Sequence, residues 1–239
     1  MEIKFLGTGG AFDHAYGNSA AWVTLGGKHL LVDCGNTVYH ALRKTNLADH
    51  IDYLLITHLH DDHVGSLCTT ILHHRYLLDS PRKARLLVPD GDFRDQLYEF
   101  LRFGLIRPER YVDFLPLDTV PGLEEVNTYG LHVADMQSYG FIFEDEQEIV
   151  AYSGDLGDPN LMFRHLAARP SNKPIRVFHE LAFDQTEGIH TYYRDLVPHL
   201  EQYRIWGYHI DPTQNPADNP VPLVAHQPGL LIGGMIHKA

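Results

Sequence analysis

The sequence predicts an α/β fold in which one domain takes up most of the 239 residues. Strand-like and helix-like patterns alternate from the first residues to about position 211. Neither a linker nor a repeat of fixed period interrupts them before that point. Histidines and aspartates directly follow several of the strand-like runs. A chain of this length can bury a substantial core, so we expect one large domain with polar chemistry at its strand ends.

In the first half, an apolar-polar alternation and a glycine pair mark the strands. Gly26-Gly27 joins two strand-like runs as a hairpin signal. The run 51–57 is almost continuously apolar, which is typical of a strand buried on both faces. The expected strands are 2–6, 20–25, 29–32 and 51–57, and the expected helices are 38–43 and 64–78. The histidines that follow position 57 therefore lie where a buried strand passes into a helix.

The second half repeats this rhythm, with shorter runs. The expected strands are 85–88, 112–115, 131–134, 140–143, 148–153, 175–179 and 204–208, and the expected helices are 92–103 and 192–201. We assign 1–211 to the domain and treat 212–239 as a separate tail. The tail carries Pro212, Pro216, Pro220, Pro222 and Pro228, which exclude a regular helix or a central strand. Its apolar patches, 222–225 and 230–236, predict that it packs on its own domain or on a second subunit of a homodimer.

Composition narrows the class of function. The formal net charge of −12 disfavours non-specific binding to nucleic acid. No window approaches 18 uninterrupted apolar residues, so we expect no membrane span, and the N-terminus lacks the pattern of a signal peptide. With two cysteines only, Cys34 and Cys68, we expect no disulfide framework and a cytoplasmic location. The chain has 17 histidines, and histidine is the commonest metal ligand, so the spacing of these histidines decides whether a metal site is expected.

The segment Thr57-His58-Leu59-His60-Asp61-Asp62-His63 holds the strongest signal for a metal site. In an extended loop, residues two apart project the same way, so His58 and His60 can hold one ion. Asp62 and His63 follow where the chain turns into the helix and can face a second ion. Imidazole and carboxylate ligands together suit zinc, manganese or iron.

Two further residues end strands in the order that such a site needs. Asp155 closes Tyr152-Ser153-Gly154-Asp155, and His209 closes Trp206-Gly207-Tyr208-His209. Alone, each is better explained as a turn aspartate and a core histidine. Beside a half-built site for two ions, we interpret them as a bridging carboxylate and a further imidazole.

These motifs, taken in order, resemble the metallo-β-lactamase superfamily, and more closely its ribonuclease Z-like phosphodiesterase branch. The resemblance spans roughly residues 2–210 and includes Lys4 to Gly10, Leu31-Val32-Asp33-Cys34-Gly35 and His179-Glu180-Leu181-Ala182-Phe183. It implies an αββα sandwich, with two mixed sheets face to face, helices outside and metals at one edge.

The resemblance also implies residue roles. His58 and His60 would bind metal one, and Asp62, His63 and His209 metal two, while Asp155 bridges. Asp33 would steady the ligands from behind. His179, oriented by Glu180, would stabilise or protonate the leaving oxygen, and Asp62 would also accept a proton from metal-activated water. His190-Thr191 is a candidate for lining the pocket, although the first turn of a helix explains this pair better.

The sequence departs from the family pattern in two places. The family has a metal histidine about six residues before a Tyr/Phe-Gly pair, but the position that matches it before Tyr139-Gly140 is Ala134. His132 and Asp135 lie nearby, out of register, so three outcomes stay open: metal one loses a ligand and binds weakly, uses Asp135, or is absent. The tRNA-processing enzymes also carry a long insertion between that histidine and the bridging aspartate. Here Ala134 and Asp155 are only 21 positions apart, so we expect tRNA to be a poor substrate.

Three functions follow as alternatives. The first is metal-dependent hydrolysis of a small phosphodiester, with one or two divalent ions, zinc being expected first. The second is hydrolysis of a carboxylic ester, a thioester or a lactone. The third is a degenerate member that binds a ligand without catalysis. Ala134 favours the third alternative, and the His179-Glu180 pair disfavours it, because a binding protein needs no acid for a leaving group.

Overall fold

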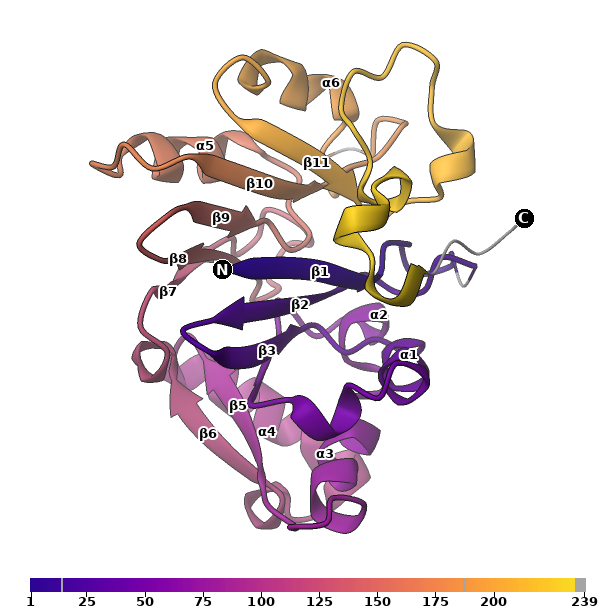
Figure 1. The fold of residues 1–239 in the computed structure, drawn as a ribbon, viewed down its shortest axis with the longest axis vertical. Coiled ribbons are helices and arrows are strands. Elements are labelled where there is room, and N and C mark those ends of the chain that lie inside the picture. Colours follow the sequence, from indigo (N-terminus) through magenta and orange to yellow (C-terminus); the bar gives the residue numbers. More distant parts are fainter. Residues whose placement is uncertain (14, 187, 235–239) are drawn as a thin grey trace.

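The computed structural model describes residues 1–13, 15–186 and 188–234 and shows the expected αββα sandwich. Two sheets lie face to face with helices on their outer sides (Figure 1). Among the described residues, no helix is long and apolar enough to cross a membrane.

The first sheet has six strands in chain order, β1 to β6. The pairs β1–β2 and β2–β3 are antiparallel, and β3 to β6 run parallel to one another. Its strands are β1 Glu2–Gly7, β2 Ala20–Leu25, β3 Lys28–Val32, β4 Tyr53–Leu55, β5 Ala84–Val88 and β6 Val112–Pro116. Parallel strands place their carboxyl ends at one edge, so the segments after β3 and β4 meet there.

The second sheet has five strands in the order β11-β10-β9-β8-β7. Strands β9, β10 and β11 are parallel, and β7 and β8 complete the sheet in antiparallel fashion. Its strands are β7 Leu123–Asn127, β8 Tyr139–Glu144, β9 Ile149–Tyr152, β10 Ile175–Glu180 and β11 Arg204–Tyr208. The carboxyl ends of β9, β10 and β11 lead into Asp155, Glu180 and His209.

The core between the sheets centres on Phe5, whose ring lies 5.3 Å from that of Phe178 and 5.6 Å from that of Tyr208. Helices cover the outer faces: α1 Val38–Lys44, α2 Asp61–Val64, α3 Leu67–Tyr76 and α4 Gly91–Leu105 beside the first sheet, and α5 Asn160–Ala167 and α6 Tyr193–Leu196 beside the second. In α4, apolar residues four apart form the buried face, and Asp90 caps the helix by accepting a hydrogen bond from Phe93 N at 2.8 Å.

The structure differs from the sequence-based expectations at several elements, and helix α5, Asn160–Ala167, is one that the sequence analysis does not assign. The expected strand 131–134 is a turn, while Leu123–Asn127, which we had not assigned, forms the edge strand β7. The expected helix 64–78 is two helices, α2 and α3, separated at Gly65-Ser66. The expected helix 192–201 is a short α6 followed by a 3-10 turn at Val197–His199.

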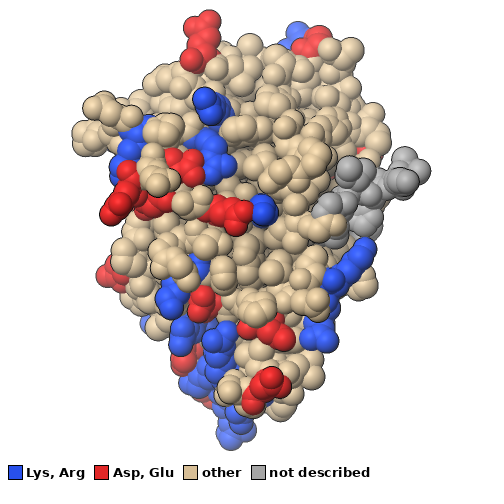
Figure 2. Space-filling view, viewed as in Figure 1, with Lys and Arg blue, Asp and Glu red and all other residues tan. Residues whose placement is uncertain are grey.

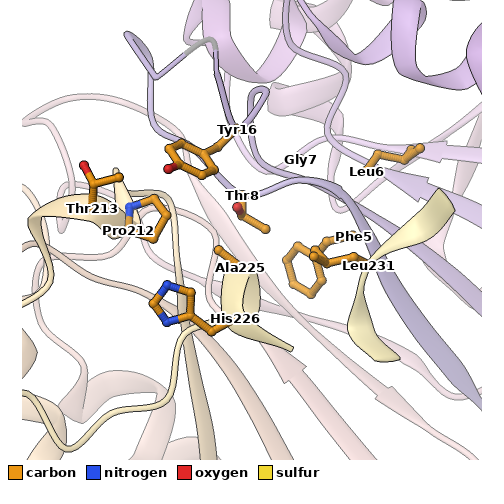
Figure 3. A pocket seen from close by; sticks show the side chains of 10 residues that line it. All are labelled: Phe5, Leu6, Gly7, Thr8, Tyr16, Pro212, Thr213, Ala225, His226 and Leu231. Atoms are coloured by element: carbon orange, nitrogen blue, oxygen red, sulfur yellow. The ribbon is translucent and has the colours of Figure 1, made fainter. Parts of the chain in front are cut away.

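The tail packs on its own domain in the part of it that the structure describes. Leu231 forms a parallel bridge with Phe5 of β1, and Leu223 forms one with Gly207 of β11. The tail consists of short 3-10 turns, as its prolines require. Between it and the end of β1 lies a pocket of about 230 Å³, lined by Phe5, Leu6, Gly7, Thr8, Tyr16, Pro212, Thr213, Ala225, His226 and Leu231 (Figure 3). In these contacts the tail packs on its own domain.

Candidate metal centre

The first group of ligand-type atoms consists of His58, His60 and His132. His58 and His60 lie on the extended loop after β4, with His58 Nε2 3.0 Å from His60 Nδ1. His132 Nε2 lies 3.1 Å from the same His60 Nδ1. Around a tetrahedral zinc ion with ordinary Zn–N bonds, ligand nitrogens are roughly 3.3 Å apart. The three nitrogens are therefore spaced as ligands of one ion would be.

The second group consists of Asp62 and His63 of α2 and His209, which follows β11. His209 Nε2 lies 3.1 Å from Asp62 Oδ2, and His63 Nε2 lies 3.3 Å from the same oxygen. The right-handed turn that starts α2 places these two residues beyond the loop histidines. Both sheets thus contribute to this group, which lies at the edge where their strand ends meet.

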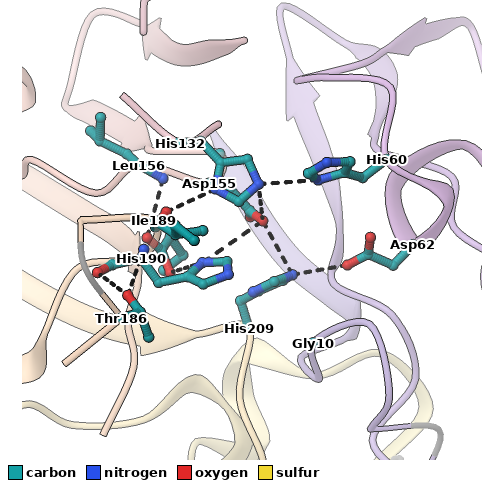
Figure 4. A network of polar contacts seen from close by, with 12 residues as sticks. Gly10, His60, Asp62, His132, Asp155, Leu156, Thr186, Ile189, His190 and His209 are labelled. Carbon is teal, nitrogen blue, oxygen red and sulfur yellow. Dashed lines mark hydrogen bonds and ion pairs between the residues drawn. The ribbon is translucent and has the colours of Figure 1, made fainter. Parts of the chain in front are cut away.

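Asp155 lies between the two groups (Figure 4). Its Oδ2 is 3.9 Å from His58 Nε2 and 3.7 Å from His132 Nε2, and its Oδ1 is 3.5 Å from His63 Nε2. Oδ2 is also 3.5 Å from His209 Nε2. One carboxylate therefore faces both groups, which is the arrangement of a bridging ligand.

Buried polar atoms test whether this set fits metal ions. His63 Nε2 and Asp155 Oδ1 are buried and have no hydrogen-bond partner among the described residues. Burial by itself raises the pKa of Asp155, but the charges of His209 and His63 outweigh it and hold this pKa well below its usual range. Buried, ionised and short of partners, these groups fit a pair of divalent cations.

Asp33 and Thr57 orient the ligands from behind. Thr57 Oγ1 donates to Asp33 at 3.0 Å and lies 3.0 Å from His58 Nδ1, while Asp33 Oδ2 accepts from His63 Nδ1 at 2.9 Å. Because the Nδ1 atoms are engaged, the Nε2 atoms of His58 and His63 face the cluster. Asp33 takes a positive φ of 63° at the end of β3, which turns its side chain toward these rings. Asp33 thus contacts Thr57 and His63 from behind the cluster.

His132, rather than residue 134, places a third imidazole beside His58 and His60. Residues 131–134 form a turn, so strand register does not govern which way they point. His132 Nδ1 donates to Ile189 O at 2.8 Å, which turns Nε2 toward the cluster. Asp135 is exposed, and its Oδ1 accepts a hydrogen bond from Tyr129 Oη at 3.3 Å. The expectation that Asp135 replaces a histidine absent at Ala134 is therefore wrong.

The structure does not bring His179 to the cluster. Neighbouring residues of a strand point to opposite faces, so Glu180 and His179 on β10 cannot both face the metals. The His179 ring is buried near Phe163, with ring centroids 6.1 Å apart and nearly parallel planes, and burial lowers its pKa. The role in protonating a leaving oxygen, which we had assigned to His179, does not fit this position.

Glu180 faces the cluster and holds His190. Its Oε2 accepts a hydrogen bond from His190 Nδ1 at 3.1 Å, and its Oε1 accepts from the backbone N–H groups of Leu156 and Thr191. Burial lowers the pKa of His190, but the hydrogen bond and charge of Glu180 outweigh burial and raise it to about 9. His190 Nδ1 is 4.0 Å from Asp155 Oδ2. Glu180 therefore favours the protonated form of this imidazole beside the cluster, and the sequence signal for it is only His190-Thr191.

The chain is similar in sequence to a family of known proteins. The sequence model of the family described as "Anti-Pycsar protein Apyc1" matches residues 1–222. The chain belongs to this family. A protein of that name from Bacillus phage BSP38 is 31% identical over 232 residues, which cover 87% of this chain and 88% of the phage protein.

Solved structures confirm the metallo-β-lactamase fold of this Apyc1 family member. YhfI from Bacillus subtilis, described as a metallo-β-lactamase fold protein, aligns with a TM-score of 0.65 at 17% identity, covering 87% of this chain and 85% of YhfI. The short form of human tRNase Z aligns with a TM-score of 0.61 at 21% identity, covering 93% and 96%. The predicted sandwich fold is confirmed.

Proposed function

We propose that the protein is a metal-dependent hydrolase of small phosphodiesters, with zinc as the expected ion. The observation that carries this proposal is the His190–Glu180 pair beside the clustered His and Asp side chains that could hold metal ions. A binding protein has no use for a cationic imidazole held at the edge of a dinuclear site. A tetrahedral carboxylic-ester intermediate carries one negative charge, whereas a phosphodiester in its transition state carries more, which a third cationic group suits.

Two divalent ions would lower the pKa of a bound water and neutralise charge on the attacking and leaving oxygens. The chain's own residues do the rest. Asp62, ionised at neutral pH, can accept the proton of the attacking water as well as bind metal. His190 can hold a phosphate oxygen and donate its Nε2 proton to the leaving oxygen. Glu180 keeps His190 protonated and fixes the direction of its ring.

The family name extends the proposal. The relatives are called anti-Pycsar proteins, and we propose that this chain has an anti-Pycsar action too, based on its hydrolysis of a phosphodiester. The length of one segment of the chain favours a small substrate. Only 23 positions separate His132 from Asp155, which is too few for a tRNA-gripping arm.

Surface charge agrees with a small substrate. The face in Figure 2 carries Lys and Arg in several separate places, interspersed with Asp and Glu. With a net charge of −12, long-range attraction of a polyanion such as tRNA is weak.

A substrate panel tests this proposal. It contains bis(p-nitrophenyl) phosphate, cyclic and linear nucleotide diesters, a thioester, a lactone and a precursor tRNA. We expect hydrolysis of small diesters, and a loss of about 100-fold or more in kcat for Glu180→Gln, since general acid catalysis contributes on the order of 100-fold to 10,000-fold. Glu99→Gln, an exposed carboxylate paired with Arg102 on α4, is the matched control. Activity on the thioester or lactone alone, or efficient 3′ trimming of the tRNA, would contradict the proposal.

A further inference from the structure

The pocket between the tail and the end of β1 has a polar side and an apolar side. Figure 3 shows Tyr16, Thr213 and His226 on one side of it. Phe5 and Leu231 lie together on the other side, where the tail forms its bridge with β1. Among the described residues that line the pocket, none is Lys, Arg, Asp or Glu. The pocket therefore offers an apolar wall and hydrogen-bonding groups but no fixed charge.

The volume of the pocket sets the size of a ligand. It is about 230 Å³, whereas an apolar cavity of roughly 150 Å³ is large enough to hold benzene. The pocket therefore has room for one six-membered ring with a small substituent. Phe5 is fully buried, and its ring gives a flat ligand an aromatic surface to pack against.

Thr213 indicates which polar group suits the polar side. Its hydroxyl donates to Asp211 Oδ1 at 2.7 Å, and this hydrogen bond holds the pKa of Asp211 below its usual value. The hydroxyl of Thr213 can therefore only accept a further hydrogen bond, and an anionic group beside it would face the Asp211 carboxylate. The hydroxyl of Tyr16 can donate or accept. An uncharged hydroxyl group, which both donates and accepts, fits this side better than a carboxylate does.

The pocket and the metal centre share Thr8. Thr8 lines the pocket, and its carbonyl oxygen accepts hydrogen bonds from His209 N at 2.8 Å and Ile210 N at 3.1 Å. His209 has a φ of 71°, which is uncommon for a residue other than glycine and persists only where surrounding contacts hold it. The chain then continues to Pro212 and Thr213, which also line the pocket. A molecule in the pocket would therefore restrain both the strand end that holds His209 and the residues that follow His209.

We propose that this pocket binds a small uncharged phenol, and that its occupancy strengthens metal binding by His209 through Thr8. The aromatic ring packs against Phe5 and Leu231, and the hydroxyl group faces Tyr16. Because coupling between two sites is reciprocal, metal binding strengthens binding of the phenol by the same factor. The inference goes beyond the proposed function, since binding in this pocket needs no reaction at the metal centre.

Calorimetric titration with 4-methylphenol tests the pocket. For the zinc-loaded protein, we expect a dissociation constant of about 1 mM or below. Toluene, which lacks the hydroxyl, and 4-methylbenzoate, which carries a negative charge, should each bind about fivefold more weakly, because a neutral hydrogen bond contributes about that much. In the apoprotein, the dissociation constant of 4-methylphenol should be about fivefold higher or more. Equal dissociation constants in the apoprotein and the zinc-loaded protein would overturn the coupling.

Two variants locate the ligand. Ala225→Phe fills the pocket and should abolish binding of 4-methylphenol, whereas Ala217→Phe, at an exposed position of the tail that does not line the pocket, is the matched control. Tyr16→Phe keeps the ring and removes the hydroxyl, so it should weaken binding of 4-methylphenol and leave binding of toluene unchanged. Zinc content and thermal unfolding of each variant, measured on the same samples, show whether the fold has stayed intact.

Undiminished binding of 4-methylphenol by a folded Ala225→Phe protein would place the ligand elsewhere and overturn the proposal. Equal binding of 4-methylphenol and toluene by wild type would overturn the role of the polar side. If the zinc-loaded protein binds 4-methylphenol as expected but hydrolyses no phosphodiester, the proposed function fails and this inference stands.

Discussion

Single residues decide how complete the metal centre is. The histidines and aspartates of the motif 58–63 could be assigned from the sequence because their geometry is local, fixed by one loop and one helical turn. His132 and His190 could not, because each depends on a contact with a distant segment. His132 is turned by the carbonyl of Ile189, 57 positions away, and His190 is charged because of Glu180. Periodicity within a segment holds no information on such partners.

Replacing His132 should therefore weaken one metal ion more than the other. In His132→Ala, the first group loses one of its three imidazoles, whereas Asp62, His63 and His209 keep their geometry. We expect the affinity for one ion to fall by more than the roughly 10–100-fold that loss of an outer partner costs. Calorimetric titration of the apoprotein with zinc measures both affinities.

Ala134→His is the matched variant, because it adds an imidazole at the position that sequence register had indicated. Its two affinities should equal those of wild type, since residue 134 lies in the turn, two positions beyond the one that faces His60. Tighter binding in Ala134→His, or two undisturbed sites in His132→Ala, would show that His132 is not the ligand.

At the scale of elements, strand alternation is the most informative pattern in the sequence. It predicts strand β10. Because neighbouring residues of a strand point to opposite faces, it also excludes that His179 and Glu180 act together at the metal site, as the resemblance implies. The edge strand β7, with the sequence Leu-Glu-Glu-Val-Asn, carries little apolar signal because one of its sides has no neighbour strand. Residues 131–134 are more apolar and yet form a turn after Gly130. Pairing with other strands, rather than the local pattern, separates these two cases.

Helix α3 contains a titratable group that should make stability depend on pH. His74 is buried, and neither ring nitrogen has a hydrogen-bond partner among the described residues. Burial, with the nearby charge of Arg82, lowers its pKa from 6.5 to about 4. The unfolded chain binds this proton more readily than the folded one between those values. Stability from neutral His74 is therefore full above pH 6.5 and is lost as the pH falls toward 4.

His74→Phe removes this proton-binding group while keeping the shape of the ring. Between pH 7 and pH 5, the free energy of unfolding of wild type should fall by about 2 kcal/mol more than that of the variant. Urea unfolding of both proteins in the presence of a chelator, so that metal release does not contribute, measures the difference. Equal losses in the two proteins would show that His74 is not neutral and buried in solution.

At the scale of the whole molecule, the sandwich brings together ligands that are far apart in the sequence. Residues near 60, 132, 155, 190 and 209 meet at the edge where the strands of both sheets end. The fold class followed from the alternation of elements and from motif order, and the structure confirms it. The described part of the tail pairs with β1 and β11 of its own chain, through the bridges Phe5–Leu231 and Gly207–Leu223. The two sheets thus contribute to one site, so replacing any one of these side chains tests whether they bind metal together.

A dinuclear phosphodiesterase is tested by following phosphodiester hydrolysis while the apoprotein is titrated with zinc, with bound metal measured on the same samples. We predict that the apoprotein is inactive and that activity rises to a plateau at two ions per chain. Asp155→Asn, which alters the carboxylate that faces both groups, should bind fewer ions and stay inactive. Full activity in the apoprotein, or two bound ions with no hydrolysis of any phosphodiester, would show that the protein is not a metal-dependent phosphodiesterase.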